Sequence, residues 1–269
     1  MLQKNKPIFL IKLGGSLITD KQKLNSFNAR SIRNCFSKLA SFYQPENHGL
    51  IIGNGAGANT HYLAKKYQTL QGITDSQTTI GHCLVKESAL RHHSWLNQIG
   101  VLKGLPLFSF SPSSFLLSEK GSIKKSFFSA LLYCLEKKIV PHLYGDVIFD
   151  KKTGLTIYST EKIFIWLCQN LQEKGFKQLI VYFLGDTNGV LDENKKTIKV
   201  LKSTDLTKYK LVIGQSAGFD VTGGMLQKVK AGLYLAKLGC RVYIGNGNSF
   251  LPDNLKSPQK SQNLTEIVA

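Results

Sequence analysis

The sequence predicts an α/β fold, a three-layer α/β/α sandwich whose central sheet is mainly parallel. Short runs rich in Ile, Leu, Val and Phe alternate along the chain with longer segments in which apolar residues recur every three or four positions. This alternation is typical of strands and amphipathic helices. Several of the short runs stop at glycine-rich turns, which is how buried strands end on loops. Strands that alternate with helices favour a parallel sheet covered on both faces.

The first half of the chain supplies three predicted strands and three predicted helices. The apolar run Ile8–Leu13 stops at Gly14 and Gly15, so it predicts a buried strand. A long helix is predicted over Gln77–Ile99, because helix formers dominate this segment and Gly100 follows it. The other elements predicted here are a helix over 27–42, a strand at 50–52, a helix that begins near 62–67 and a strand at 105–110.

A helix and a hairpin begin the second half. Residues 125–138 are amphipathic and predict a helix that leads into a strand at 139–144. Strands at 147–150 and 155–158 flank a short loop that ends in Gly154, as expected of a hairpin. The remaining predicted elements are a helix at 163–171, strands at 179–184 and 241–244, a helix at 225–238, and a tail at 251–269 that is either frayed or a last short strand.

Composition narrows the class of protein. The 269 residues suit one large domain or two fused lobes. A net charge of +18 either favours anionic partners, such as phosphorylated metabolites, nucleotides, nucleic acid or an acidic membrane surface, or reflects a lysine-rich proteome. The five cysteines form no C-x-x-C pair, so neither a disulfide framework nor a zinc site is indicated. No apolar run is long enough to span a bilayer, and we expect a cytoplasmic protein without a membrane partner.

Three glycine-rich turns, at residues 12–16, 53–57 and 218–225, each follow a predicted strand and precede a predicted helix. Small residues in such turns let backbone N–H groups approach a phosphate closely. Two of the turns have a lysine nearby, which favours a polyphosphate site. The turns match neither the Walker A loop nor the Rossmann fingerprint, and the protein-kinase signatures are absent. An ordinary P-loop enzyme is therefore disfavoured.

Residues 11–21, Ile-Lys-Leu-Gly-Gly-Ser-Leu-Ile-Thr-Asp-Lys, resemble the opening of the isopentenyl phosphate kinases, a branch of the amino acid kinase superfamily. The resemblance continues over roughly residues 8 to 248, in the family's order and spacing. It includes the turn at 54–61, the segment 106–115, the run 140–147, and Asp-Val-Thr-Gly-Gly-Met at 220–225 followed by Lys228.

The resemblance implies a single amino acid kinase-like domain that transfers a phosphoryl group directly and in line from ATP. Residues 1–175 would form the lobe that binds the acceptor, and residues 176–269 the lobe that binds the nucleotide. Mg²⁺ would sit on the nucleotide phosphates, with no ligands from protein side chains. Positioning and cancellation of developing charge do most of the work in such a transfer.

The resemblance also implies roles for individual residues. Lys12 and Lys21 would contact the transferring phosphoryl group, and Lys228 would hold the ATP phosphates. His61 would hydrogen-bond the phosphate of the acceptor, and Glu161 would orient the lysines. The residues expected to bind ATP are Lys12, Gly14, Gly15, Ser16, Gly185, Asp186, Asn188, Gly189, Gly223, Gly224 and Lys228. Those expected to bind the acceptor are Gly55, Ala56, Gly57, His61, Gly145, Ser159 and Thr160.

The chain departs from the family pattern at the acceptor and at the residue that orients the lysines. Where the family reads Ser-Gly-Asp-Asp, this chain has Ser-Thr-Glu-Lys at 159–162, so Glu161 would need its longer arm to replace the aspartate. Asn54 replaces the first histidine of the family's His-Gly-Gly-Gly turn, and Ala56 replaces its middle glycine. On the nucleotide side, the family's Thr-Asp-Val-Asp-Gly-Val-Tyr is Gly-Asp-Thr-Asn-Gly-Val-Leu at 185–191.

Three functions follow as hypotheses. The first is an ATP-dependent kinase of a small phosphate monoester, with isopentenyl phosphate as the default acceptor; a kinase of a phosphonate or another small anion, like the fosfomycin kinases, is a close alternative. The second is a non-catalytic nucleotide-binding regulator. The third is a nucleic-acid binder, which only the charge favours; no nucleic-acid partner is expected. We expect the acceptor pocket walls to come from 77–99 and 108–115, and the family suggests a homodimer.

Overall fold

The computed structural model describes residues 3–20, 26–205, 224–250, 255, 257–258 and 261–269. Their central feature is an eight-stranded sheet in the order β10-β12-β11-β9-β1-β2-β6-β3. Its neighbouring strands are parallel except for β11 and β12, which pair antiparallel. The strands are β1 (Ile8–Leu13), β2 (Gly49–Asn54), β3 (Leu107–Ser109), β6 (Val140–Tyr144), β9 (Leu179–Gly185), β10 (Val200–Lys202), β11 (Arg241–Asn246) and β12 (Leu264–Val268).

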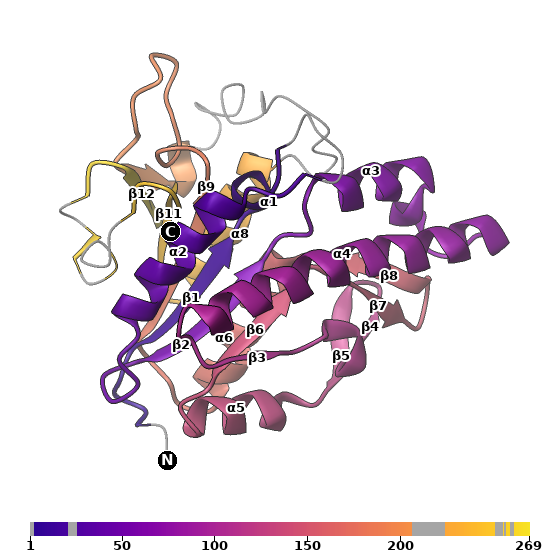
Figure 1. The fold of residues 1–269 in the computed structure, drawn as a ribbon, viewed down its shortest axis with the longest axis horizontal. Helices are drawn as coiled ribbons and strands as arrows, with labels where there is room; N and C mark the ends of the chain where they lie inside the picture. The colour runs from indigo at the N-terminus through magenta and orange to yellow at the C-terminus, as the bar shows by residue number, and fades with distance from the viewer. Residues whose placement is uncertain (1–2, 21–25, 206–223, 251–254, 256, 259–260) are drawn as a thin grey trace.

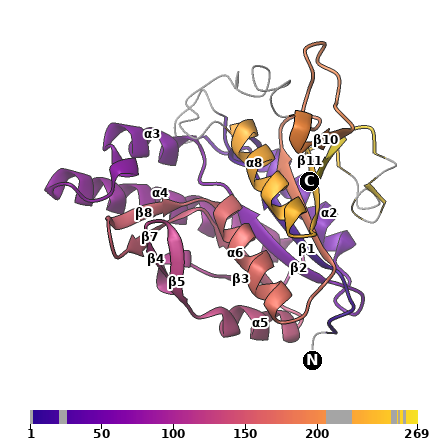
Figure 2. The ribbon, with the colours of Figure 1, turned by 180° about the vertical axis from the view of Figure 1, so that it is seen from behind.

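Helices cover both faces of this sheet. Because successive side chains of a strand point to opposite faces, Ile8 and Leu10 of β1 pack with α5, α6 and α8, whereas Phe9 and Ile11 pack with α2 and α4. Figure 1 shows α2 and α4 in front of the sheet, and Figure 2 shows α6 and α8 from the other side. The helices are α1 (Gly15–Ile18), α2 (Ala29–Phe42), α3 (Ala58–Lys66), α4 (Ser76–Leu102), α5 (Phe128–Glu136), α6 (Thr160–Glu173) and α8 (Gly224–Lys237), with short 3₁₀ turns η1 (Thr69–Gln71), η2 (Pro112–Ser114) and η3 (Ser203–Asp205).

A smaller four-stranded sheet lies beside one end of α4 (Figure 1). Asp75 caps the start of this helix: its carboxylate accepts the Thr78 N–H, and the Thr78 hydroxyl accepts the Asp75 N–H. Val85 of α4 packs with Val147 of the small sheet and with Ala64 of α3. The small sheet has the order β5-β4-β7-β8, with strands β4 (Leu116–Glu119), β5 (Ser122–Ser126), β7 (Asp146–Asp150) and β8 (Gly154–Tyr158).

The predicted three-layer fold is confirmed, and most predicted elements are present with ends shifted by a few residues. One prediction is wrong in part: the helix expected over 125–138 begins only at Phe128, because residues 122–126 form strand β5. The small sheet is larger than expected, since only its β7–β8 hairpin was predicted. The C-terminal tail was predicted to be either frayed or a last short strand. Its residues Leu264–Val268 form strand β12.

Asp150 anchors the small sheet, and we expect Asp150→Ala to lower the free energy of unfolding by about 3 kcal/mol. Its buried carboxylate accepts hydrogen bonds from the backbone of two hairpin turns. The substitution therefore removes several charge-assisted hydrogen bonds at once. Chemical denaturation measures the loss, and Glu193→Ala at an exposed position is the control. A loss no larger than that of the control would contradict this role. The donors to Asp150 are the Ser118 hydroxyl and the N–H groups of Lys120, Gly121, Lys152 and Thr153.

None of the helices in the described part of the chain combines the length and the apolar character that a membrane crossing requires.

Candidate active site

Three neighbouring strands end together at the carboxyl edge of the central sheet. Strand β1 is parallel to β2 and β9, with Lys12 opposite Gly53 and Phe183. The glycine turns that follow β1 and β2 therefore lie side by side at this edge. A pocket opens there, where ligands of open parallel sheets commonly bind. Its polar part is lined by Lys12, Gly14, Gly15, Ser16, Thr19, Gly55, Ala56, Gly57, His61, Gly145, Ser159, Thr160, Glu161, Asp186, Thr187, Gly224, Gln227 and Lys228, among others.

The two glycine turns touch, which explains why they lack side chains. A Cβ added to Gly55 would lie 2.8 Å from the amide nitrogen of Gly15, and a Cβ on Gly14 would lie 2.8 Å from the carbonyl oxygen of Leu184. Both separations are shorter than van der Waals contact allows, and the atoms met are backbone. A larger residue at Gly55 would therefore push the two turns apart, and a larger residue at Gly14 would collide with the end of β9.

Thr19 joins the same two turns. Its hydroxyl donates to the carbonyl oxygen of Gly15 at 3.1 Å and accepts the N–H of Ala58 at 3.1 Å. The side chain is buried at the pocket wall. One hydroxyl thus holds the turn after β1 against the start of α3.

Lys12 and Glu161 form a buried ion pair in the lining of the pocket. Lys12 lies near the end of β1, and Glu161 lies in the first turn of α6, which Ser159 caps by accepting the N–H of Lys162. Burial by itself would raise the pKa of Glu161, but the charge and hydrogen bond of Lys12 outweigh it, so the pKa is lowered. The carboxylate stays ionised, and its longer arm does reach the lysine.

Lys228 of α8 also lines the pocket. A Cβ added to Gly185 would lie 2.7 Å from its Nζ, and one on Gly14 would lie 3.6 Å away. Its charge also contributes to the lowered pKa of Glu161. The structure thus brings Lys12, Glu161 and Lys228 together. Lys21 and Gly223, which the sequence also singled out, lie outside the described residues.

Backbone N–H groups face the same space. Within the described part of the chain, the N–H groups of Gly15, Ser16, Ala56 and Gly57 have no hydrogen-bond acceptor, and all four residues line the pocket. Backbone donors grouped in this way suit an anion such as phosphate.

The candidate acceptor residues meet at the end of β2. The backbone oxygen of Asn54 accepts the Gly145 N–H at 3.2 Å and the Thr160 hydroxyl at 2.7 Å. Thr160, which replaces a glycine of the family pattern, therefore uses its hydroxyl to tie α6 to β2. His61 lies in the first turn of α3 and lines the pocket.

Three of the described residues that were predicted to bind ATP do not line the pocket: Gly185, Asn188 and Gly189. Asn188 accepts hydrogen bonds from the Asn246 side chain and the Thr197 hydroxyl. Gly189 has a φ of 74° and packs against Thr265. Asn188 and Gly189 hold the loop after β9 in shape, and their contact with ATP stays a prediction.

The pocket continues into an apolar end that the sequence did not reveal in full. The expectation that α4 supplies part of its wall holds, because Val85 and Ala89 line it. The segment 108–115, also expected, contributes none of the described lining. The other walls come from α3, η1 and the small sheet, which no sequence pattern had placed together. The apolar lining is Ala64, Leu70, Val85, Ala89, Val147 and Ile157.

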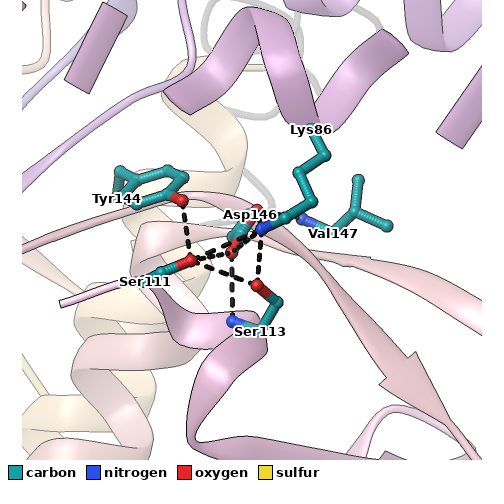
Figure 3. A network of polar contacts seen from close by, with 6 residues as sticks. All are labelled: Lys86, Ser111, Ser113, Tyr144, Asp146 and Val147. Atoms are coloured by element: carbon teal, nitrogen blue, oxygen red, sulfur yellow. Dashed lines mark hydrogen bonds and ion pairs between the residues drawn. The ribbon is translucent and has the colours of Figure 1, made fainter. Parts of the chain in front are cut away.

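A buried carboxylate braces this end of the pocket, and the sequence analysis missed it. Asp146, which lines the pocket and is 2% exposed, pairs with Lys86 of α4 at 3.1 Å. Figure 3 shows that it also holds Ser111 and Ser113 of the neighbouring loop. Asp146 thereby fixes α4 and η2 to the start of β7.

Comparisons with known proteins agree with this geometry. A sequence model of the amino acid kinase family matches residues 7–246. The chain is 28% identical over 246 residues to the isopentenyl phosphate kinase of Methanocaldococcus jannaschii, covering 89% of this chain and 90% of that protein. It is 26% identical over 262 residues to the isopentenyl phosphate kinase of Methanothermobacter thermautotrophicus, covering 93% and 94%.

The fold is also that of solved structures. A crystal structure of an isopentenyl phosphate kinase matches with a TM-score of 0.78 and 22% identity, covering 97% of this chain and 100% of that one. An N-acetylglutamate synthase from Neisseria gonorrhoeae matches with a TM-score of 0.62 and 14% identity, covering 98% of this chain and 59% of that one.

Proposed function

Because the chain belongs to the amino acid kinase family, we propose that it is an ATP-dependent kinase that phosphorylates isopentenyl phosphate. The resemblance to the isopentenyl phosphate kinase branch is confirmed by relatives that match over nearly their whole length. The observation that carries the proposal is that one pocket has a polar, positively charged end and an apolar end. One end holds two buried lysines and unpaired N–H groups, and the other end is apolar.

The polar end suits phosphoryl transfer between two anions. Lys12 and Lys228 can neutralise charge that develops on the moving phosphoryl group, and the N–H groups of the two turns can bind its oxygens. The ion pair with Glu161 holds the Lys12 ammonium group in one position. Because the ion pair with Glu161 would fix Lys12, little reorganisation would be needed at the moment of transfer.

We assign the acceptor to the side of the pocket formed by residues 1–175 and the nucleotide to the side formed by 176–269. His61 and the turn at 55–57 would bind the acceptor phosphate, and the apolar end would receive a short hydrocarbon group. Gly185, Gly224 and Lys228 would face the ATP phosphates. Lys21 remains a further predicted contact of the transferring phosphoryl group.

Mg²⁺ on the nucleotide fits these residues. Within the described ranges, no cluster of three or more His, Cys, Asp and Glu side chains could hold a metal ion by itself. Nucleotide-bound Mg²⁺ needs only one or two carboxylates, because phosphate oxygens and water supply its other ligands. Asp146 and Glu161 are paired with lysines, and Asp186 also lines the pocket, where it would face the water shell of the nucleotide-bound ion without binding the ion itself. When bound, Mg²⁺ neutralises charge on the nucleotide phosphates.

Location and assembly complete the proposal. All five cysteines are free thiols, which supports a reducing compartment such as the cytoplasm. A homodimer is proposed from the family alone, and light scattering on the purified protein would test it.

The function is tested by an acceptor screen. Purified protein with Mg·ATP and isopentenyl phosphate is expected to release ADP and to give a diphosphate product, which ³¹P NMR identifies. Turnover of fosfomycin or another phosphonate in place of isopentenyl phosphate would move the assignment to the phosphonate kinases. Calorimetric ATP binding without turnover of any acceptor would instead indicate a regulator. A salt-dependent affinity for DNA that competes with ATP would indicate a nucleic-acid binder.

A further inference from the structure

Asn54 occupies a central position behind the acceptor turn. It is the last residue of β2, is fully buried and directly precedes Gly55. Its side-chain nitrogen donates to the carbonyl oxygen of Gly55 at 3.0 Å, and its Oδ1 lies 2.7 Å from Nδ1 of His93 on α4. The side chain therefore links the long helix to the first peptide of the turn.

The hydrogen bonds define the tautomer of His93. Asn54 uses its amide nitrogen toward Gly55, so Oδ1 can only accept and His93 Nδ1 must donate. The Nε2 atom of the neutral ring then accepts the Ser109 hydroxyl, 2.7 Å away. Burial lowers the pKa of His93 to about 3, so the ring stays neutral at physiological pH. The ring also stacks on Tyr144 with centroids 4.4 Å apart, which fixes its plane.

The hydrogen bonds from Ser109 through His93 and Asn54 to Gly55 fix the direction of one backbone donor, the N–H of Ala56. In a planar trans peptide the carbonyl and the N–H point in opposite directions. With the Gly55 carbonyl turned back toward Asn54, the N–H of Ala56 is directed away from it. Ala56 lines the pocket, and its N–H has no acceptor among the described residues.

We propose that His93 and Asn54 are a positioning pair that aims the Ala56 N–H at the phosphate of the acceptor substrate. Neither side chain touches substrate. The inference rests on the proposed function and extends it to residues outside the pocket lining. In the motif that this turn resembles, a histidine occupies the position of Asn54. Here the side chain at that position pairs with a buried imidazole from α4, so we expect the two side-chain types of the pair to be exchangeable.

The first test is His93→Phe, which keeps a stacking ring but removes both hydrogen bonds. The KM for isopentenyl phosphate is expected to rise about tenfold, with the KM for ATP changed less than about twofold, because only the acceptor turn loses its orientation. His82→Phe is the matched control. His82 is equally buried on α4, and its Nδ1 contacts only the Thr78 carbonyl of its own helix. The control should leave the KM for isopentenyl phosphate at its wild-type value.

The second test exchanges the pair. Asn54→His and His93→Asn are each expected to raise the acceptor KM, and the double variant should return it to within about threefold of wild type. An unchanged acceptor KM in His93→Phe, an equal rise for ATP, or a double variant no better than the singles would overturn the proposal. A general loss of folding would instead lower the concentration of active enzyme, and with it the apparent kcat, while leaving both KM values unchanged.

A measurement on the unmodified protein covers the case of variants that do not fold. ¹⁵N NMR of the imidazoles is expected to show His93 protonated at Nδ1 and neutral throughout the neutral pH range. Protonation at Nε2 would overturn the pair even if isopentenyl phosphate is turned over. Conversely, the expected NMR pattern in a protein that turns over no acceptor would refute the proposed function and leave the Asn54–His93 geometry standing.

Discussion

Lys12→Ala is expected to abolish phosphoryl transfer, with a fall in kcat of about 10³-fold or more. Lys12 is 7% exposed and lies at the junction of the two glycine turns, where a transferring phosphoryl group would pass between donor and acceptor. A fixed charge there stabilises the transition state more than the ground state, so its loss appears mainly in kcat. Coupled ADP release with saturating substrates measures the effect. Calorimetry should show that ATP still binds.

The same substitution leaves Glu161 buried without its partner, and this effect must be separated from catalysis. Removing one member of a buried pair costs about 3–5 kcal/mol. The double variant Lys12→Met with Glu161→Gln carries no buried charge at either position and should regain much of this stability while remaining inactive. Activity restored together with stability would show that Lys12 acts through folding alone.

Much of the fold could be predicted because the apolar residues of each segment are also the residues that the fold buries. Ile8–Leu13 is an apolar run that stops at a glycine pair, and it forms a strand buried along its whole length. Strand β5 could not be predicted in this way, because Ser122–Ser126 is mostly exposed and polar. Its turn did carry a signal. Lys120 and Gly121 have φ values of 50° and 75°, as in a two-residue hairpin turn, but lysine in place of asparagine hides it.

The candidate site also has one part that local sequence patterns predict and one part that they do not. Its polar end could be predicted, because glycine turns and lysines at strand ends converge wherever parallel strands are neighbours. The apolar end could not, since Val85 of α4 and Val147 of the small sheet meet only through tertiary packing. Asp146 was hidden for the same reason. Its partner Lys86 is 60 positions away, and among 35 basic residues no local pattern distinguishes that lysine.

Glu161→Gln is expected to lower kcat about 100-fold while leaving the side-chain volume unchanged. Glutamine can still accept a hydrogen bond from Lys12, but it no longer supplies the negative charge that pairs with Lys12 and attracts Lys228. Without that charge Lys12 loses its ion-pair partner and with it its fixed position. Glu161→Asp, which restores the residue of the family pattern with a shorter arm, keeps the charge and should lose no more than about tenfold.

The pH dependence of stability gives an independent test of the same residue. Because the pKa of Glu161 is lowered in the folded protein, its contribution is present above its pKa in the unfolded chain, about 4.3. That contribution is lost as the pH falls through the folded value. Glu161→Gln should therefore unfold less steeply with acid than wild type in urea titrations below about pH 5. Parallel acid profiles, or wild-type kcat in Glu161→Gln, would show that Glu161 neither stabilises Lys12 by charge nor positions it for transfer.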